Sequence, residues 1–195
     1  MKRAILSFVA ALMFMLPAGL FAQNHAEISV FGDYYRQQAI NENLFGIGGR
    51  IGFAVHPNIK LEADLAYDFE HNYSTTISGA GCGTNVTTCT GSNGLRATSF
   101  SFGPKFQFGK DSPIRAFIFT KGGFVRFGSS STAVTLGNFP TGLSNRDVNG
   151  TFYPGGGLEL FAGWFGIRGD VGDQIYFDRG AHNNIRITFG PVIRF

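Results

Sequence analysis

Charged residues are scarce in this chain, making up 15% of its 195 residues against about 25% in an average soluble domain. Cysteine (2 residues), tryptophan (1) and proline (7) are also few. After the N-terminal segment no run of about 20 apolar residues occurs, so a helical membrane span is not expected. What the chain has instead is 28 glycines and 22 phenylalanines. Glycine disfavours helix interiors and aromatic residues favour strands, so the composition excludes a helical bundle and predicts an all-β fold.

The first 22 residues have the three parts of a secretory signal peptide. Lys2 and Arg3 supply the positive charge, residues 4–16 form an apolar stretch, and small residues end at Ala22. We predict cleavage after Ala22, which leaves a single domain over 23–195. Loss of the two basic residues lowers the formal net charge from +3 to +1. Such a chain gives no reason to expect a nucleic-acid partner.

The two cysteines, Cys82 and Cys89, lie in a stretch rich in glycine, serine, threonine and asparagine. In an exported protein, two thiols so close in sequence predict a disulfide bond. A pair of free thiols is the alternative. No histidine lies nearby at ligand spacing, so a metal site is not expected, and no cofactor-binding motif is present.

Alternation of apolar and polar residues is the dominant pattern of the exported part of the chain. In residues 59–69 the odd positions are apolar, whereas Lys60, Glu62, Asp64 and Asp68 occupy the other face. Eight such segments predict eight strands: 26–35, 45–55, 59–69, 96–108, 114–127, 152–161, 166–177 and 184–195. Their connections are alternately short and long. The two longest, 70–95 and 128–151, are predicted to be loops on one rim, an arrangement typical of outer-membrane β-barrels.

A weak repeat, Gly-[Gly/Pro]-x-apolar-x-apolar, occurs in every second predicted strand. In each copy the first glycine shares a face with the polar residues. A strand glycine usually marks a bend or a close approach, so we predict that these glycines face a crowded barrel interior. Chance recurrence in a glycine- and phenylalanine-rich chain is the alternative. The copies are residues 48–53, 103–108, 155–160 and 190–195.

Eight alternating strands also fit a soluble, lipocalin-like barrel whose apolar face points inward. Three features favour a membrane barrel: the ions cluster on one face, the strands have about 10–12 residues, and aromatic residues recur at strand ends as interfacial girdles require. These girdle candidates are Phe53, Phe69, Phe108, Trp164, Phe165, Phe177 and Phe195.

The signal peptide, the rhythm of eight strands and the terminal pattern Ile187-x-Phe189-x-Pro191-x-Ile193-x-Phe195 resemble the small outer-membrane β-barrels, which include OmpA-type transmembrane domains, OmpX and the opacity proteins. The resemblance covers residues 24–195. It implies an eight-stranded antiparallel up-and-down transmembrane β-barrel in the bacterial outer membrane, monomeric and surrounded by lipid. It also implies that Ile187, Phe189, Ile193 and Phe195 are read by the barrel-assembly machinery. Pro191 departs from the pattern, and we expect a bend or bulge there because proline cannot donate a ladder hydrogen bond.

The short turns predict which charges meet inside the barrel, since a tight turn sets hairpin register. Pairing Val55 with Ile59 places Arg50 opposite Asp64. Pairing Phe161 with Gly166 places Glu159 opposite Arg168, and closure of the barrel places Arg194 near Glu27. The predicted interior holds seven acids and seven bases. These are Glu27, Asp33, Glu62, Asp64, Asp68, Glu159 and Asp170, with Arg50, Lys60, Lys105, Lys121, Arg168, Arg186 and Arg194.

No catalytic group is predicted. His25 and His56 lie near the N-terminus and in a short turn, and His71 and His182 are expected on the outer rim. His71 with Ser74 is the one candidate base and nucleophile, and no third group orients it. We therefore expect a non-enzymatic structural or surface-interaction protein with a lumen plugged by paired charges, which binds a surface ligand through loops 70–95 and 128–151. A small pore or hydrophobic-ligand channel is the first alternative, and a lipid-modifying enzyme acting at the rim is the second.

Overall fold

The computed structural model describes residues 26–38, 41–78, 88–109, 112–132 and 148–195. These segments contain strands β1 (Ala26–Gln37), β2 (Glu42–His56), β3 (Ile59–Ser78), β4 (Thr88–Phe108), β5 (Ile114–Thr132), β6 (Val148–Ala162), β7 (Phe165–Asp173), β8 (Ile175–Phe177), β9 (Ala181–His182) and β10 (Asn184–Arg194). No helix among them is long and apolar enough to cross a membrane. The predicted signal peptide lies outside the described residues, so its cleavage stays a prediction.

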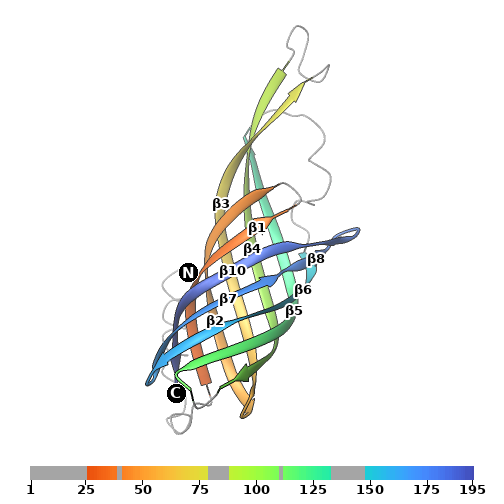
Figure 1. Cartoon of the computed structure of the whole chain (residues 1–195). Coiled ribbons are helices and arrows are strands. Elements are labelled where there is room, and N and C mark those ends of the chain that lie inside the picture. Colours follow the sequence, from red (N-terminus) through yellow and green to blue (C-terminus); the bar gives the residue numbers. More distant parts are fainter. Residues whose placement is uncertain (1–25, 39–40, 79–87, 110–111, 133–147) are drawn as a thin grey trace, which may run out of the picture.

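Eight of the strands close into an antiparallel barrel (Figure 1). The ring runs β1-β2-β3-β4-β5-β6-β7-β10, and β10 pairs with β1 to complete it. The short strands β8 and β9 extend the hairpin formed by β7 and β10, and β8 pairs with β6. Closure leaves no edge in the body of the barrel, as a strand in lipid requires. The predicted eight-stranded barrel is confirmed.

Side chains alternate between a buried face and an exposed face along each strand of the ring. In β10, Ile187 is 45% exposed and its neighbour Thr188 is 2% exposed. The exposed face carries many large apolar residues, and they include the aromatic residues Phe53, Phe108 and Trp164 at strand ends. The buried face instead carries most of the charged residues. The barrel is therefore apolar outside and charged inside, the reverse of a soluble barrel.

Two of the strand registers agree with those expected from the short turns. Arg50 lies opposite Asp64 in the β2–β3 pair, and Glu159 lies opposite Arg168 in the β6–β7 pair. The turn itself differs in the first hairpin: Ile59 pairs with His56 rather than with Val55, and the register shifts between Ala54 and His56. This bulge adds one residue to β2, so the correct register is reached through a tighter turn than predicted.

The closing seam joins the first and last strands. Ala26 and Phe195 exchange two backbone hydrogen bonds of 3.0 Å. The bulge expected at Pro191 is absent, because the register is the same on both sides of it. The Ser29 hydroxyl donates a 2.7 Å hydrogen bond to the Pro191 carbonyl. This side-chain bond ties β1 to β10 beside the position where proline offers no N–H group.

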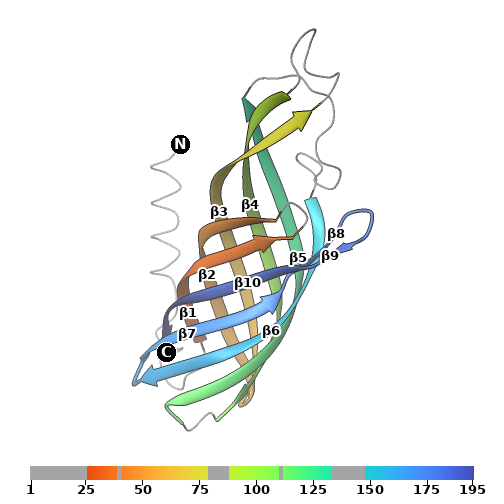
Figure 2. The same cartoon turned by 45° about the horizontal axis from the view of Figure 1, so that its top comes forward.

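Strands β3, β4 and β5 extend well beyond the rest of the ring (Figures 1 and 2). The β3–β4 pairing continues to Ser78 opposite Thr88. The expectation of a loop over 70–95 was therefore wrong for most of that range. Residues 70–95 carry serine, threonine and asparagine at both odd and even positions. The alternation of apolar and polar residues that predicts a strand is therefore missing from this range. The expected loop 128–151 is also shorter, since β5 continues to Thr132 and β6 begins at Val148.

The repeated glycines face the interior, as predicted. A Cβ atom placed on Gly48 would collide with the ring of Phe31, and one on Gly155 would collide with the ring of Phe119. At Gly103 and Gly190 it would collide with the backbone of the neighbouring strand. The absence of a side chain at these positions lets aromatic rings and adjacent strands occupy the narrow interior.

Candidate functional site

The main feature of the barrel interior is a continuous network of buried ion pairs. Side chains from seven strands, β1 to β7, contribute to it, because the inward positions of adjacent strands lie side by side. It holds equal numbers of acids and bases, and its members are Glu27, Arg50, Lys60, Glu62, Asp64, Lys105, Lys121, Glu159, Arg168 and Asp170. We call this set the central network.

Glu62 of β3 is the hub of the central network. Its carboxylate lies 2.9 Å from Lys105 Nζ, 2.8 Å from Lys121 Nζ and 2.6 Å from Arg168 Nη1. These three cations come from β4, β5 and β7, so a single carboxylate connects strands on opposite sides of the ring. A charge buried in this way is tolerable because several partners surround it.

The network obstructs the lumen with side chains that also hold one another in place. Arg50 bridges Asp64 at 2.7 Å and Asp170 at 2.9 Å. Lys121 reaches the same Asp64 at 2.7 Å, and Arg168 reaches the same Asp170 at 2.9 Å. An interior of eight strands is just wide enough for side chains to fill. The interlocked pairs therefore occupy the interior at the level of the central network.

Aromatic rings line one side of the central network, which the sequence did not reveal. Phe117 and Phe119 of β5 point inward and pack with Tyr153 of β6. The Arg168 guanidinium lies 4.1 Å from the Phe117 ring centroid, and Lys121 Nζ lies 4.8 Å from that of Phe119. Cation–π contacts of this kind stabilise desolvated cations. Residues 114–127 are apolar on both faces, so periodicity alone could not assign the inward one.

The structure brings together two of the three charge pairs expected from the sequence. Arg50 and Asp64 form a two-point contact of 2.7 and 3.2 Å. Arg168 lies 3.2 Å from Glu159, although its shorter contact is with Glu62.

The third expected pair, Glu27 with Arg194, is wrong at the level of side chains. Their backbones are opposite each other, but Glu27 binds Lys60 and Lys105. Arg194 instead donates a 2.8 Å hydrogen bond to the Gly163 carbonyl. Its guanidinium stacks on the ring of Phe161, 4.4 Å from the centroid. A long arginine near the β6–β7 turn can reach the Gly163 carbonyl instead of the carboxylate opposite it, which register cannot predict.

A second, smaller group of charges lies above the central network. Arg186 of β10 contacts both carboxylate oxygens of Asp33, at 2.5 and 3.0 Å. It also donates hydrogen bonds to Ser99 and Gln174, at 3.1 and 3.0 Å. Asp68 of β3 is buried here as well. Among the described residues no cation forms an ion pair with it.

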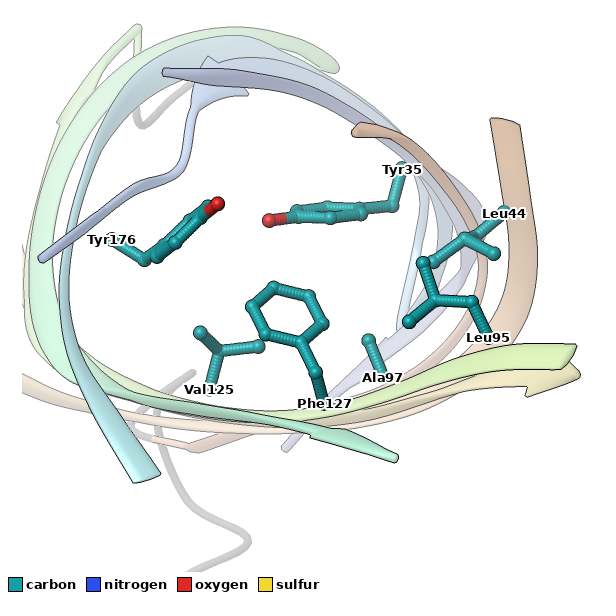
Figure 3. Packing of buried hydrophobic residues seen from close by; sticks show 7 residues of the cluster. All are labelled: Tyr35, Leu44, Leu95, Ala97, Val125, Phe127 and Tyr176. Carbon is teal, nitrogen blue, oxygen red and sulfur yellow. The ribbon is translucent and has the colours of Figure 1, made fainter. Parts of the chain in front are cut away.

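An apolar cluster fills the barrel above these charges. Figure 3 shows its side chains pointing into the lumen from opposite walls, with the hydroxyl groups of Tyr35 and Tyr176 facing each other. The rings of Phe127 and Tyr176 are 5.2 Å apart. We call this cluster the apolar cap. Its members are Tyr35, Leu44, Leu95, Ala97, Val125, Phe127 and Tyr176. Sequence periodicity does not reveal the apolar cap, because each strand contributes only one or two apolar residues at positions that otherwise alternate as polar.

The described histidine contacts are with residues other than Ser74, so the candidate pair of His71 and Ser74 is not tested. His71 Nε2 lies 3.7 Å from Glu42, and the side chain of Ser74 falls outside the described ones. His182 stacks on Tyr176 with 4.8 Å between ring centroids. Within the described segments no three histidine, cysteine, aspartate or glutamate side chains are grouped to hold a metal ion. His25 and Cys82 lie outside the described residues, so the disulfide between Cys82 and Cys89 stays a prediction.

No family model and no curated protein matches the chain. Solved structures do match it. The N-terminal β-barrel domain of Pseudomonas aeruginosa OprF has a TM-score of 0.51 at 18% identity, over 89% of this chain and 98% of that one. Ail of Yersinia pestis has a TM-score of 0.50 at 12% identity, over 88% of this chain and 97% of that one. OprG of P. aeruginosa has a TM-score of 0.51 at 8% identity, over 88% of this chain and 96% of that one.

The fold is that of the small eight-stranded outer-membrane β-barrels, as the sequence resemblance implied. The likeness to OprF, Ail and OprG spans nearly the whole of each solved chain. At these identities it concerns architecture, so the particular role of this chain is argued from its own residues.

Proposed function

We propose that this chain is a bacterial outer-membrane protein with a surface-interaction role, whose barrel anchors the protruding sheet of β3, β4 and β5. The pairing of β2 with β3 ends at Gly46 opposite Asp68. Beyond the register shift that follows Asp68, residues 71–78 pair with β4 on one side, and among the described residues no strand pairs with their other side. This free edge of β3 is the observation that carries the proposal.

The free edge lacks two of the usual protections against strand pairing. Residues 71–78 contain neither lysine nor proline, the residues that natural proteins place on edges to prevent it. The open side of these eight residues can add a strand from another protein, with hydrogen bonds supplying affinity. The expected partner is therefore a protein that offers an extended strand at the cell surface.

Shortening the β3–β4 hairpin tests this role. Joining Asn72 to Gly94, which are opposite each other, through an Asn-Gly turn removes the extension and keeps the pairs below it. Cells that display wild type should attach to an immobilised β-sandwich protein, and cells with the short hairpin should attach no better than cells lacking the protein. An immobilised all-helical protein is the matched control. Equal attachment by the two forms would contradict the proposal.

Export and assembly follow from the same proposal. Residues 1–22 act as a cleaved signal peptide, and the last strand is recognised by the barrel-assembly machinery. In support, Ile187, Phe189 and Ile193 share the exposed face of β10, where a membrane or an assembly factor can contact them. Membrane lipid surrounds the remaining outward face.

A plugged lumen predicts the absence of porin-like conduction. The central network and the apolar cap lie one above the other in the lumen, so a solute would have to displace both. We expect no large, stable single-channel steps from the purified monomer in a planar bilayer. A porin of 16 or more strands, which leaves an aqueous channel, is the positive control. Steady porin-sized steps would favour the alternative function of a pore.

A further inference from the structure

The buried charges are balanced in one part of the lumen and unbalanced in another. The central network has five acids and five bases. The group above it has Asp33 and Asp68 but a single buried cation, Arg186. Arg186 is already engaged by Asp33, Ser99 and Gln174. One negative charge is therefore left uncompensated beneath the apolar cap.

The two carboxylates flank a position without a side chain. Gly46 of β2 lies opposite Asp33 of β1 on one side and opposite Asp68 of β3 on the other. A Cβ atom on Gly46 would lie 2.5 Å from Asp68 Oδ1. Because Gly46 has no side chain, the Asp68 carboxylate can extend into the space beside it at the barrel wall. Asp33 lies on the opposite side of Gly46, on the neighbouring strand.

Three buried oxygen atoms without hydrogen-bond partners among the described residues line the lumen from Asp68 up to the apolar cap, where the Gln37 amide donates to the Tyr176 hydroxyl. Asp68 Oδ1, Tyr35 Oη and Gln37 Oε1 have no hydrogen-bond partner within the described chain. Their residues are 2%, 1% and 0% exposed. Tyr35 and Gln37 follow Asp33 along the inward face of β1, and Figure 3 shows the Tyr35 hydroxyl pointing into the lumen. Buried polar atoms of native proteins are normally satisfied, so these three exceptions call for a bound species.

We propose that a monovalent metal cation, Na⁺ in the first instance, binds beside Gly46 between Asp33 and Asp68. Its single positive charge cancels the uncompensated carboxylate. The available donors are carboxylate, hydroxyl and amide oxygens, which are the ligands of hard cations. The apolar cap above and the central network below separate the ion from both openings of the barrel. The ion completes the neutralisation of the lumen and thereby stabilises the folded protein.

Unfolding of the full chain in lipid vesicles tests the site with Na⁺ as the probe. NaCl is exchanged for choline chloride at constant ionic strength, so that general screening does not change. A cation that binds the folded state stabilises it by mass action. Wild type should therefore unfold at higher urea in Na⁺, with an unfolding equilibrium constant that falls about 100-fold when Na⁺ reaches 100 times its dissociation constant.

Three variants separate the site from general effects of salt. Asp68→Asn removes the charge to be balanced and should abolish the Na⁺ response. Glu70→Gln removes the same charge from the exposed face of the same strand and should keep the full response. Tyr35→Phe retains the ring in the apolar cap and removes one oxygen, so its half-saturating Na⁺ concentration should rise about fivefold.

The proposal is wrong if wild type is insensitive to Na⁺, or if Asp68→Asn responds as wild type does. An infrared band of a protonated carboxylic acid at neutral pH that is lost in Asp68→Asn would show that a proton, rather than a metal ion, neutralises Asp68. If Asp68→Asn fails to fold, the comparison of wild type with Tyr35→Phe still tests the site. Identical Na⁺ titrations of those two proteins would overturn the site.

Discussion

Glu62→Ala should lower the free energy of unfolding by about 3–5 kcal/mol, the range found when one partner of a buried ion pair is removed. The reason is that three cations lose a shared carboxylate: Lys105, Lys121 and Arg168 all contact Glu62 at 2.9 Å or less. Without Glu62, these three buried cations repel one another in the lumen. Urea unfolding in lipid vesicles, followed by tryptophan fluorescence of Trp164 and by gel mobility, measures the change.

Glu42→Ala is the matched control for Glu62→Ala. Glu42 also belongs to a strand of the ring, but its carboxylate is partly exposed and its ion-pair contact is the 3.7 Å approach of His71. Exposed pairs contribute about 0–1 kcal/mol. The two variants should therefore differ several-fold in their effect. Equal losses of stability would mean that the central network does not hold the barrel together.

Ile187→Arg should destabilise the barrel by about 2–4 kcal/mol, the cost of arginine on the lipid face near the bilayer midplane. Ile187 is on the outward face of β10 and is 45% exposed, whereas the adjacent Thr188 is buried inside. Thr188→Ser keeps a small hydroxyl in the lumen and should change stability little. Folding into vesicles of defined thickness measures both.

The comparison of Ile187→Arg with Thr188→Ser tests the orientation of the whole barrel wall, because one residue of slip exchanges the two faces of a strand. Arginine at a position that faced water would cost little. Similar folding free energies for the two variants would therefore contradict a lipid-facing Ile187, and with it the membrane setting of the barrel.

The proposed plug held by charges and the proposed surface role are compatible with each other. The ion pairs occupy the membrane-level part of the interior, where they connect most strands of the ring. The free edge of β3 lies in the extension, beyond the point where β2 stops pairing. Changes in the extension are therefore expected to alter binding and leave the barrel intact, and changes in the central network are expected to do the opposite.

In the body of the barrel, the strands, their order and the facing of most of them were readable from the sequence because they depend on local periodicity. In β3, apolar residues alternate with Lys60, Glu62 and Asp64, and a period of two assigns each to one face. Short turns then placed Arg50 opposite Asp64 and Glu159 opposite Arg168. Register followed from a count of residues, without knowledge of distant strands.

Beyond these two hairpin pairs, tertiary structure alone decided which charges meet, because the lumen brings together side chains from all around the ring. Glu62 binds Arg168, more than a hundred residues away. Long flexible side chains can contact partners several strands away, so strand register alone does not determine which ion pairs form. The same holds for Arg194, which turned to Gly163. The apolar cap has the same origin, since strands far apart in sequence each supply one or two of its side chains. Local pattern thus determined the wall of this barrel, and three-dimensional closure determined what fills it.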